Sequence, residues 1–142
     1  MKNPIIEKRL KEFINKYSDA PDLYWVPLVN LRINIPVVSF DLDEIYKNSD
    51  IVLLENVFKI CHISDVNVFQ MDHCEYFQHE NIIELLYEKD DDGYNFPWYV
   101  ETFYFDSSEK WLVYVSHEGT ISFTGRKITE VAAQCIDKVY IC

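Results

Sequence analysis

In WYVETFYFDSSEKWLVYVSHEGTISFTG, residues 98–125, three apolar runs alternate with short polar stretches. The runs cover 98–105, 111–116 and 120–124, and the polar stretches between them are DSSE and HEG. Aromatic and β-branched residues bounded by turn-forming residues are typical of strands. We therefore predict an antiparallel meander of three strands in this part of the chain.

The middle and last strands of this meander differ in their pattern. Residues 111–115 are all apolar, which predicts a central strand that is covered on both faces. In 120–124, Ile121 and Phe123 alternate with hydroxyl-bearing residues, which predicts one packed face and one wetter face.

His117 and Glu118 lie between these two strands and have two interpretations. A three-residue connection that ends in glycine is a common hairpin geometry, with Gly119 in the left-handed conformation. Alternatively, the imidazole of His117, which titrates near neutral pH, acts as a general base oriented by Glu118. Adjacent strand residues point to opposite faces, so this second interpretation needs a turn that folds Glu118 back. We favour the hairpin and keep catalysis by His117 and Glu118 as the alternative.

Helices are predicted at both ends of the chain. Near the N-terminus, Asn3 can cap a helix that begins with Pro4, and apolar residues recur at helical spacing as far as Tyr17. Near the C-terminus, residues 128–136 have the spacing of a short helix that follows Gly125. Together with the meander, these helices predict an α+β fold with a mostly antiparallel sheet.

For the segments between these elements, the sequence distinguishes less clearly between helix and strand. Residues 42–47 fit a short helix capped by Asp41, and residues 66–71 alternate as a strand does. Residues 51–63 and 80–88 are each compatible with a helix or with a strand.

The formal net charge of −11 is concentrated in the middle of the chain. Residues 41–109 carry seventeen acidic and three basic residues, a net charge of −14, whereas 1–40 and 110–142 are slightly basic. Such a surface repels nucleic-acid phosphates and anionic membranes and attracts a basic partner over about 10 Å in ordinary salt. We therefore expect neither a nucleic acid nor a membrane as partner. An acidic surface that only keeps the protein in solution is the alternative.

Several classes of function are disfavoured by features that the sequence lacks. The N-terminal residues have no apolar signal-peptide core, and no apolar run approaches the roughly 18 residues of a membrane span. The four cysteines are therefore expected to be reduced thiols in the cytoplasm. With three glycines, the chain has no phosphate-binding or dinucleotide loop, so we expect no cofactor. A length of 142 residues suits a single domain over 1–142.

Two groups of residues raise the question of a metal ion. Between Cys61 and His79 the chain has two cysteines and three histidines, but adjacent residues seldom bind one ion together, and no CxxC spacing occurs. Three aspartates, 90–92, precede a glycine, yet they do not alternate as the acids of a calcium loop do. We predict no metal site in either group.

Residues 111–125, WLVYVSHEGTISFTG, resemble the C-terminal hairpin of small acidic bacterial proteins, some of which look like immunity proteins of polymorphic toxin systems. The wider group includes the SUKH superfamily. The resemblance implies an α+β protein that binds and neutralises a toxin without catalysis. It assigns no individual site residue, because such families recognise varied partners through varied surfaces.

An acidic domain without a catalytic motif suits a protein that binds a basic partner, since complementary charge speeds association. We therefore predict a non-catalytic protein-binding module, with an immunity protein against a basic, nuclease-type toxin as its most specific form. A small hydrolase or transferase that uses His117 with a carboxylate is the alternative, as is a regulatory or scaffold module. Acidic residues would steer association, and aromatic residues would anchor it. The predicted protein-binding residues are Asp41, Asp43, Glu44, Asp90, Asp91, Asp92, Tyr94 and Trp98.

Overall fold

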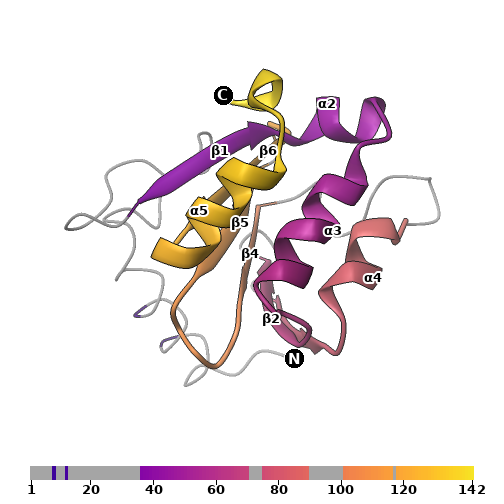
Figure 1. The fold of residues 1–142 in the computed structure, drawn as a ribbon. Coiled ribbons are helices and arrows are strands. Elements are labelled where there is room, and N and C mark those ends of the chain that lie inside the picture. The colour runs from indigo at the N-terminus through magenta and orange to yellow at the C-terminus, as the bar shows by residue number, and fades with distance from the viewer. Residues whose placement is uncertain (1–7, 9–11, 13–35, 71–74, 90–100, 117) are drawn as a thin grey trace.

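The computed structural model contains a six-stranded antiparallel sheet with helices packed on one of its faces (Figure 1). It describes Lys8, Glu12 and residues 36–70, 75–89, 101–116 and 118–142. The strands are β1 (Val37–Asp41), β2 (Val66–Gln70), β3 (Glu75–His79), β4 (Thr102–Phe105), β5 (Leu112–Val115) and β6 (Thr120–Thr124), and their order across the sheet is β1-β6-β5-β4-β2-β3. The helices are α2 (Leu42–Lys47), α3 (Ile51–Ile60), α4 (Ile82–Tyr87), α5 (Arg126–Cys135) and the short 3-10 helix η1 (Lys138–Tyr140).

The predicted α+β fold, with an antiparallel sheet and a C-terminal meander, is confirmed. β4, β5 and β6 pair in sequence order, with Tyr104 opposite Val113 and Val113 opposite Phe123. Residues 112–115 of β5 are fully buried, as expected of a central strand that is covered on both faces.

The main core lies between the sheet and helices α3, α4 and α5 (Figure 1). Successive strand residues point to opposite faces, so Val113 and Val115 belong to this core and Tyr114 does not. Phe58 of α3 contacts the sheet through Phe123, with ring centroids 6.1 Å apart. Tyr114 packs on the opposite face against Phe103, with ring centroids 4.8 Å apart. Apolar burial on both faces of one sheet supplies most of the favourable free energy of folding.

The expectation of a wetter face on β6 is wrong. Ser122 and Thr124 do alternate with core residues, but both are fully buried. Ser122 Oγ lies 2.7 Å from Ser39 Oγ of β1, and Thr124 Oγ1 donates to the carbonyl O of Pro36 at 2.9 Å. A hydroxyl that finds a hydrogen-bond partner can be buried at little cost, so the alternating pattern did not require solvent on this face.

The short helix after Asp41 is confirmed as α2, since the Asp41 carboxylate accepts a hydrogen bond from the backbone N–H of Glu44 at 3.0 Å. Both undecided segments, 51–63 and 80–88, contain helices. α3 buries one apolar stripe along its length, and the side chain of Asn81 caps α4.

The predicted C-terminal helix is present as α5, which begins at Arg126, two residues before the predicted start. The strand predicted within 66–71 is β2. The helix predicted from Pro4 to Tyr17 lies almost entirely outside the described residues.

The strand registers define two ends of the sheet. At one end of the sheet, Asp41 of β1 lies opposite Thr120 of β6. Val115, Thr102 and Gln70 are the residues of β5, β4 and β2 that lie at this same end. Because α2 follows directly after Asp41, we call it the α2 end.

The other end of the sheet holds the start of β2 and the last residues of β3 and β4. Val66 lies opposite His79, and Asn67 lies opposite Phe105. We call it the β2 end. A strand of this length spans roughly 15 Å, so the loops at the two ends form separate surfaces.

Candidate functional site

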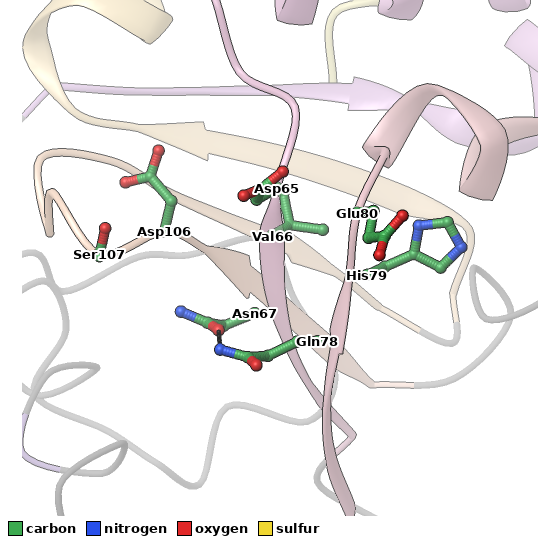
Figure 2. Close-up of a pocket in the computed structure, with 8 residues that line it drawn as sticks. All are labelled: Asp65, Val66, Asn67, Gln78, His79, Glu80, Asp106 and Ser107. Carbon is green, nitrogen blue, oxygen red and sulfur yellow. Dashed lines mark hydrogen bonds between the residues drawn. The ribbon is translucent and has the colours of Figure 1, made fainter.

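Three acidic residues from three loops lie at the β2 end of the sheet. Asp65 directly precedes β2, Glu80 directly follows β3, and Asp106 directly follows β4. Since β2 runs antiparallel to both β3 and β4, its first residue lies beside the last residues of its neighbours. A cavity of about 430 Å³, which we call the socket, lies among them (Figure 2). It is lined by Asp65, Val66, Asn67, Gln78, His79, Glu80, Asp106 and Ser107.

Most of the residues that line the socket are polar, and Val66 is the apolar one among those described. Gln78 Nε2 donates to Asn67 Oδ1 at 3.1 Å, across the paired strands β2 and β3. The Asp106 carboxylate accepts a hydrogen bond from the backbone N–H of Ser108 at 2.9 Å, which fixes the start of the β4–β5 loop. Among the described residues that line the socket, none is a lysine or an arginine, so none of them supplies a permanent positive charge beside the three carboxylates.

His79 is held by residues outside the socket. Its Nδ1 accepts a hydrogen bond from the backbone N–H of Asn81 at 3.1 Å, which leaves the neutral ring's proton on Nε2. Nε2 lies 3.6 Å from Glu88 Oε1. Asn81 and Glu88 therefore orient this imidazole.

The arrangement of the socket is suited to binding a cation. Ionised carboxylates only accept hydrogen bonds, and a guanidinium or an ammonium group is the matching donor-rich cation. The cavity lies within the size range of small-ligand pockets, so it has room for one long side chain. The socket can thus receive a lysine or an arginine side chain from a partner.

The predicted steering residues Asp41, Asp43 and Glu44 lie together at the α2 end, and we call them the α2 cluster. The backbone N–H groups of Leu42 and Asp43 donate to the carbonyl O of Gly119 at 2.7 and 3.2 Å, so the cluster lies against the β5–β6 turn. Partial burial, and then the charges of Asp41 and Glu44, raise the pKa of Asp43 above its ordinary value. The negative charges of the α2 cluster therefore repel one another. The cluster forms a second acidic surface, separate from the socket.

The connection between β5 and β6 is the predicted hairpin turn. Gly119 has φ +80°, in the left-handed region, and its N–H donates to the carbonyl O of Ser116 at 3.1 Å. Glu118 is exposed on this turn, whereas His117 lies outside the described residues. Catalysis by His117 and Glu118 therefore stays a prediction.

The remaining predicted binding residues cannot be placed relative to the socket. Asp90, Asp91, Asp92, Tyr94 and Trp98 all lie outside the described residues. Their part in protein binding stays a prediction.

Of the residues weighed as zinc ligands, Cys61, His62 and His79 are described, and His73 and Cys74 are not. Within the described ranges, no group of three or more histidines, cysteines and acidic residues could hold a metal ion. A search of the same residues finds no helix with the length and apolarity that a membrane crossing needs.

Sequence reasoning missed Asp65, Glu80 and Asp106 as a set. Each lies next to a strand, which is the one local signal that marks it. Which strand ends meet depends on the strand order, and the order was not predicted from sequence.

Comparison of the chain with models of protein families finds no match, and comparisons with curated proteins and with solved structures find none either. The description of the fold and of the socket therefore rests on this chain alone, and not on a related protein.

Proposed function

We propose that this protein is a non-catalytic protein-binding module that recognises a basic partner through the socket at the β2 end. The observation that carries the proposal is that Asp65, Glu80 and Asp106 line one cavity, and that no lysine or arginine is among the described residues that line it. A lysine or arginine side chain from a partner would supply the missing cation and would make charge-assisted hydrogen bonds.

The overall charge of the protein supports the same kind of partner. A net charge of −11 steers a basic protein toward the surface and raises its association rate. The socket adds what a diffuse charge lacks, namely a fixed position for one side chain. Long-range steering brings a basic protein to the surface, and a charged side chain held at one position would give the complex its register.

The α2 cluster is the second acidic surface, and we assign it to steering alone. It lies against the β5–β6 turn, and Glu44 Oε1 lies 3.9 Å from Lys47 Nζ. Roughly 15 Å separates the two ends of a strand, whereas charges in physiological salt are screened over about 8 Å. The α2 cluster therefore contributes little to affinity at the socket.

The finer form of the proposal is an immunity protein that acts in the cytoplasm and neutralises a basic, nuclease-type toxin. The resemblance of residues 111–125 to hairpins of immunity-like proteins supports it, as do the acidic charge and the expected reduced thiols. Such a toxin binds nucleic acid through basic residues, and an acidic inhibitor would compete for them.

The proposal is tested by affinity capture with two charge-matched variants. The socket variant carries Asp65→Asn, Glu80→Gln and Asp106→Asn, and the α2 variant carries Asp41→Asn, Asp43→Asn and Glu44→Gln. Each removes three negative charges, and asparagine preserves the capping role of Asp41. We expect a basic protein that the wild type and the α2 variant retain and the socket variant loses.

Equal loss with both variants would show that net charge alone holds the partner, and would contradict a role for the socket. Recovery of no basic protein would contradict the proposed function itself. For the finer form, the protein encoded beside this gene is expressed alone and together with the wild type. We expect the neighbouring gene's product to arrest growth when it is expressed alone. The wild type should relieve this arrest, and the socket variant should not.

A further inference from the structure

The three acidic residues of the socket lie in a row along the β2 end of the sheet. β2 pairs with β3 on one side and with β4 on the other. Asp65 directly precedes β2, Glu80 directly follows β3, and Asp106 directly follows β4. Asp65 is therefore the middle member of the row, and Figure 2 shows its side chain between those of Glu80 and Asp106.

The strand registers set the spacing within this row. The first residue of β2 lies opposite the last residue of β3, and Asn67 lies opposite Phe105, the last residue of β4. Neighbouring strands lie about 4.8 Å apart, so each step of the row is roughly 5 Å. Glu80 and Asp106 are thus attached to backbones that lie roughly 10 Å apart.

This spacing is too wide for one cation to satisfy all three carboxylates. A charge-assisted hydrogen bond joins nitrogen and oxygen at about 2.8 Å, so one ammonium nitrogen can join carboxylate oxygens that lie up to about 6 Å apart. At one strand spacing, Asp65 can share a cation with either neighbour, whereas Glu80 and Asp106 lie on opposite sides of Asp65. A guanidinium directs its paired N–H groups to a single carboxylate, so it meets the same limit.

The described groups around the row do not neutralise it. Among the described residues that line the socket, none is a lysine or an arginine, and Asp106 accepts its bond from the neutral backbone N–H of Ser108. Asp65 and Glu80 are exposed, so a partner can reach both. Like charges on neighbouring strands repel one another, and a single bound cation leaves one end of the row without a counter-charge.

We propose that the socket recognises a pair of basic side chains on one helix of the partner, at positions i and i+4. One cation lies between Asp65 and Glu80, and the other lies at Asp106. The midpoint of the first two strand ends is roughly 7 Å from the third, and residues i and i+4 lie about 6 Å apart on one face of a helix. This inference rests on the proposed function and names the element of the partner that the socket binds.

The test compares three alanine-based peptides of 17 residues, which carry one arginine, two at i and i+4, or two at i and i+5. The last two have equal charge, but their second arginine lies about 40° or 140° around the helix from the first. Circular dichroism checks that the peptides are equally helical. In calorimetric titrations at low salt, the i, i+4 peptide should bind the wild type about fivefold to tenfold more tightly than either of the others.

Double-mutant cycles check which acid each arginine contacts. Glu80→Gln and Asp106→Asn are each combined with replacement of either arginine of the i, i+4 peptide by glutamine. One arginine should couple to Glu80 and the other to Asp106, each about fivefold, and the crossed pairs should be additive. Asp43→Asn, a change of equal charge at the α2 end, should couple to neither.

The outcomes separate this inference from the proposed function. If the single-arginine peptide binds as tightly as the i, i+4 peptide, one cation satisfies the socket and the inference is wrong. Equal binding of the i, i+4 and i, i+5 peptides would also overturn it, because only their charge would then matter. If no peptide binds, the proposed function fails together with the inference.

Discussion

Asp43 packs against Gly119. Its backbone N–H donates to the carbonyl O of Gly119 at 3.2 Å, and its carboxylate occupies the space that a Cβ on Gly119 would need. The β5–β6 turn, which contains Gly119, therefore also contacts the α2 cluster and positions it.

Gly119→Ala is expected to lower the free energy of unfolding by about 1–2 kcal/mol, because φ +80° strains a residue that has a Cβ. The new Cβ would also meet Asp43 Oδ2 at 2.0 Å, but Asp43 is exposed and its carboxylate can rotate away. Urea denaturation measures the loss. Gly119→Asn should cost less, since asparagine tolerates the left-handed region.

A double variant separates strain from collision in this turn. In an Asp43→Ala background, Gly119→Ala should cost nearly the same as in the wild type. If the cost vanishes there, collision with Asp43 dominates and the explanation by backbone strain is wrong.

Asp43→Asn is expected to stabilise the protein at pH 7 and to have no such effect near pH 3. The raised pKa of Asp43 means that the folded state holds this proton more tightly than the unfolded chain does. Its stabilising contribution is full below the unfolded pKa, near 4, and is lost as pH rises through the higher folded pKa. Urea denaturation at both pH values measures the difference. A ¹³C titration that gave Asp43 an ordinary or lowered pKa would contradict this account.

Tyr114→Phe is expected to destabilise the protein by about 1–3 kcal/mol. The Tyr114 hydroxyl donates to the carboxylate of Glu101, whose exposure is 1%, and the substitution removes a donor from this buried acid.

Tyr87→Phe is the matched control for this change. The Tyr87 hydroxyl also donates to a glutamate, Glu55, at 2.5 Å, but 53% of Tyr87 is exposed, so water can replace the donor. A loss well under 1 kcal/mol is expected from thermal or urea unfolding. Equal losses for the two tyrosines would show that burial does not set the cost.

Most local elements of this fold and the pairing within the meander could be predicted from sequence, and the pairing of strands distant in sequence could not. The meander was predictable because its strands are adjacent in sequence and glycine marks the β5–β6 turn. The helical nature of 51–63 was not, because its apolar residues suit either period. β1 pairs with β6 from more than eighty residues away, as Ser39 and Ser122 show, and no local pattern encodes that contact.

The acidic character of the candidate site could be predicted from sequence, but the set of residues that forms it could not. Acidic residues within 41–109 were expected to bind a basic partner, and the socket carboxylates do fall in that range. Their convergence requires β2 to lie between β3 and β4, which is a property of the assembled sheet. Asp41, Asp43 and Glu44 were predicted because they belong to the acidic segment 41–109, and the sheet places them at the opposite end from the socket.

The central claim is that the socket, and not the net charge, recognises a basic side chain. Its most direct test is a calorimetric or NMR titration at low salt with the peptide acetyl-Gly-Arg-Gly-amide, and with a norleucine peptide as the uncharged control. The wild type and the α2 variant should bind the arginine peptide with similar Kd, with shifts of the Asn67 and Gln78 side-chain amides. The socket variant should bind it at least about tenfold more weakly. Equal weakening in the two charge-matched variants, or binding without shifts at Asn67 and Gln78, would contradict the claim.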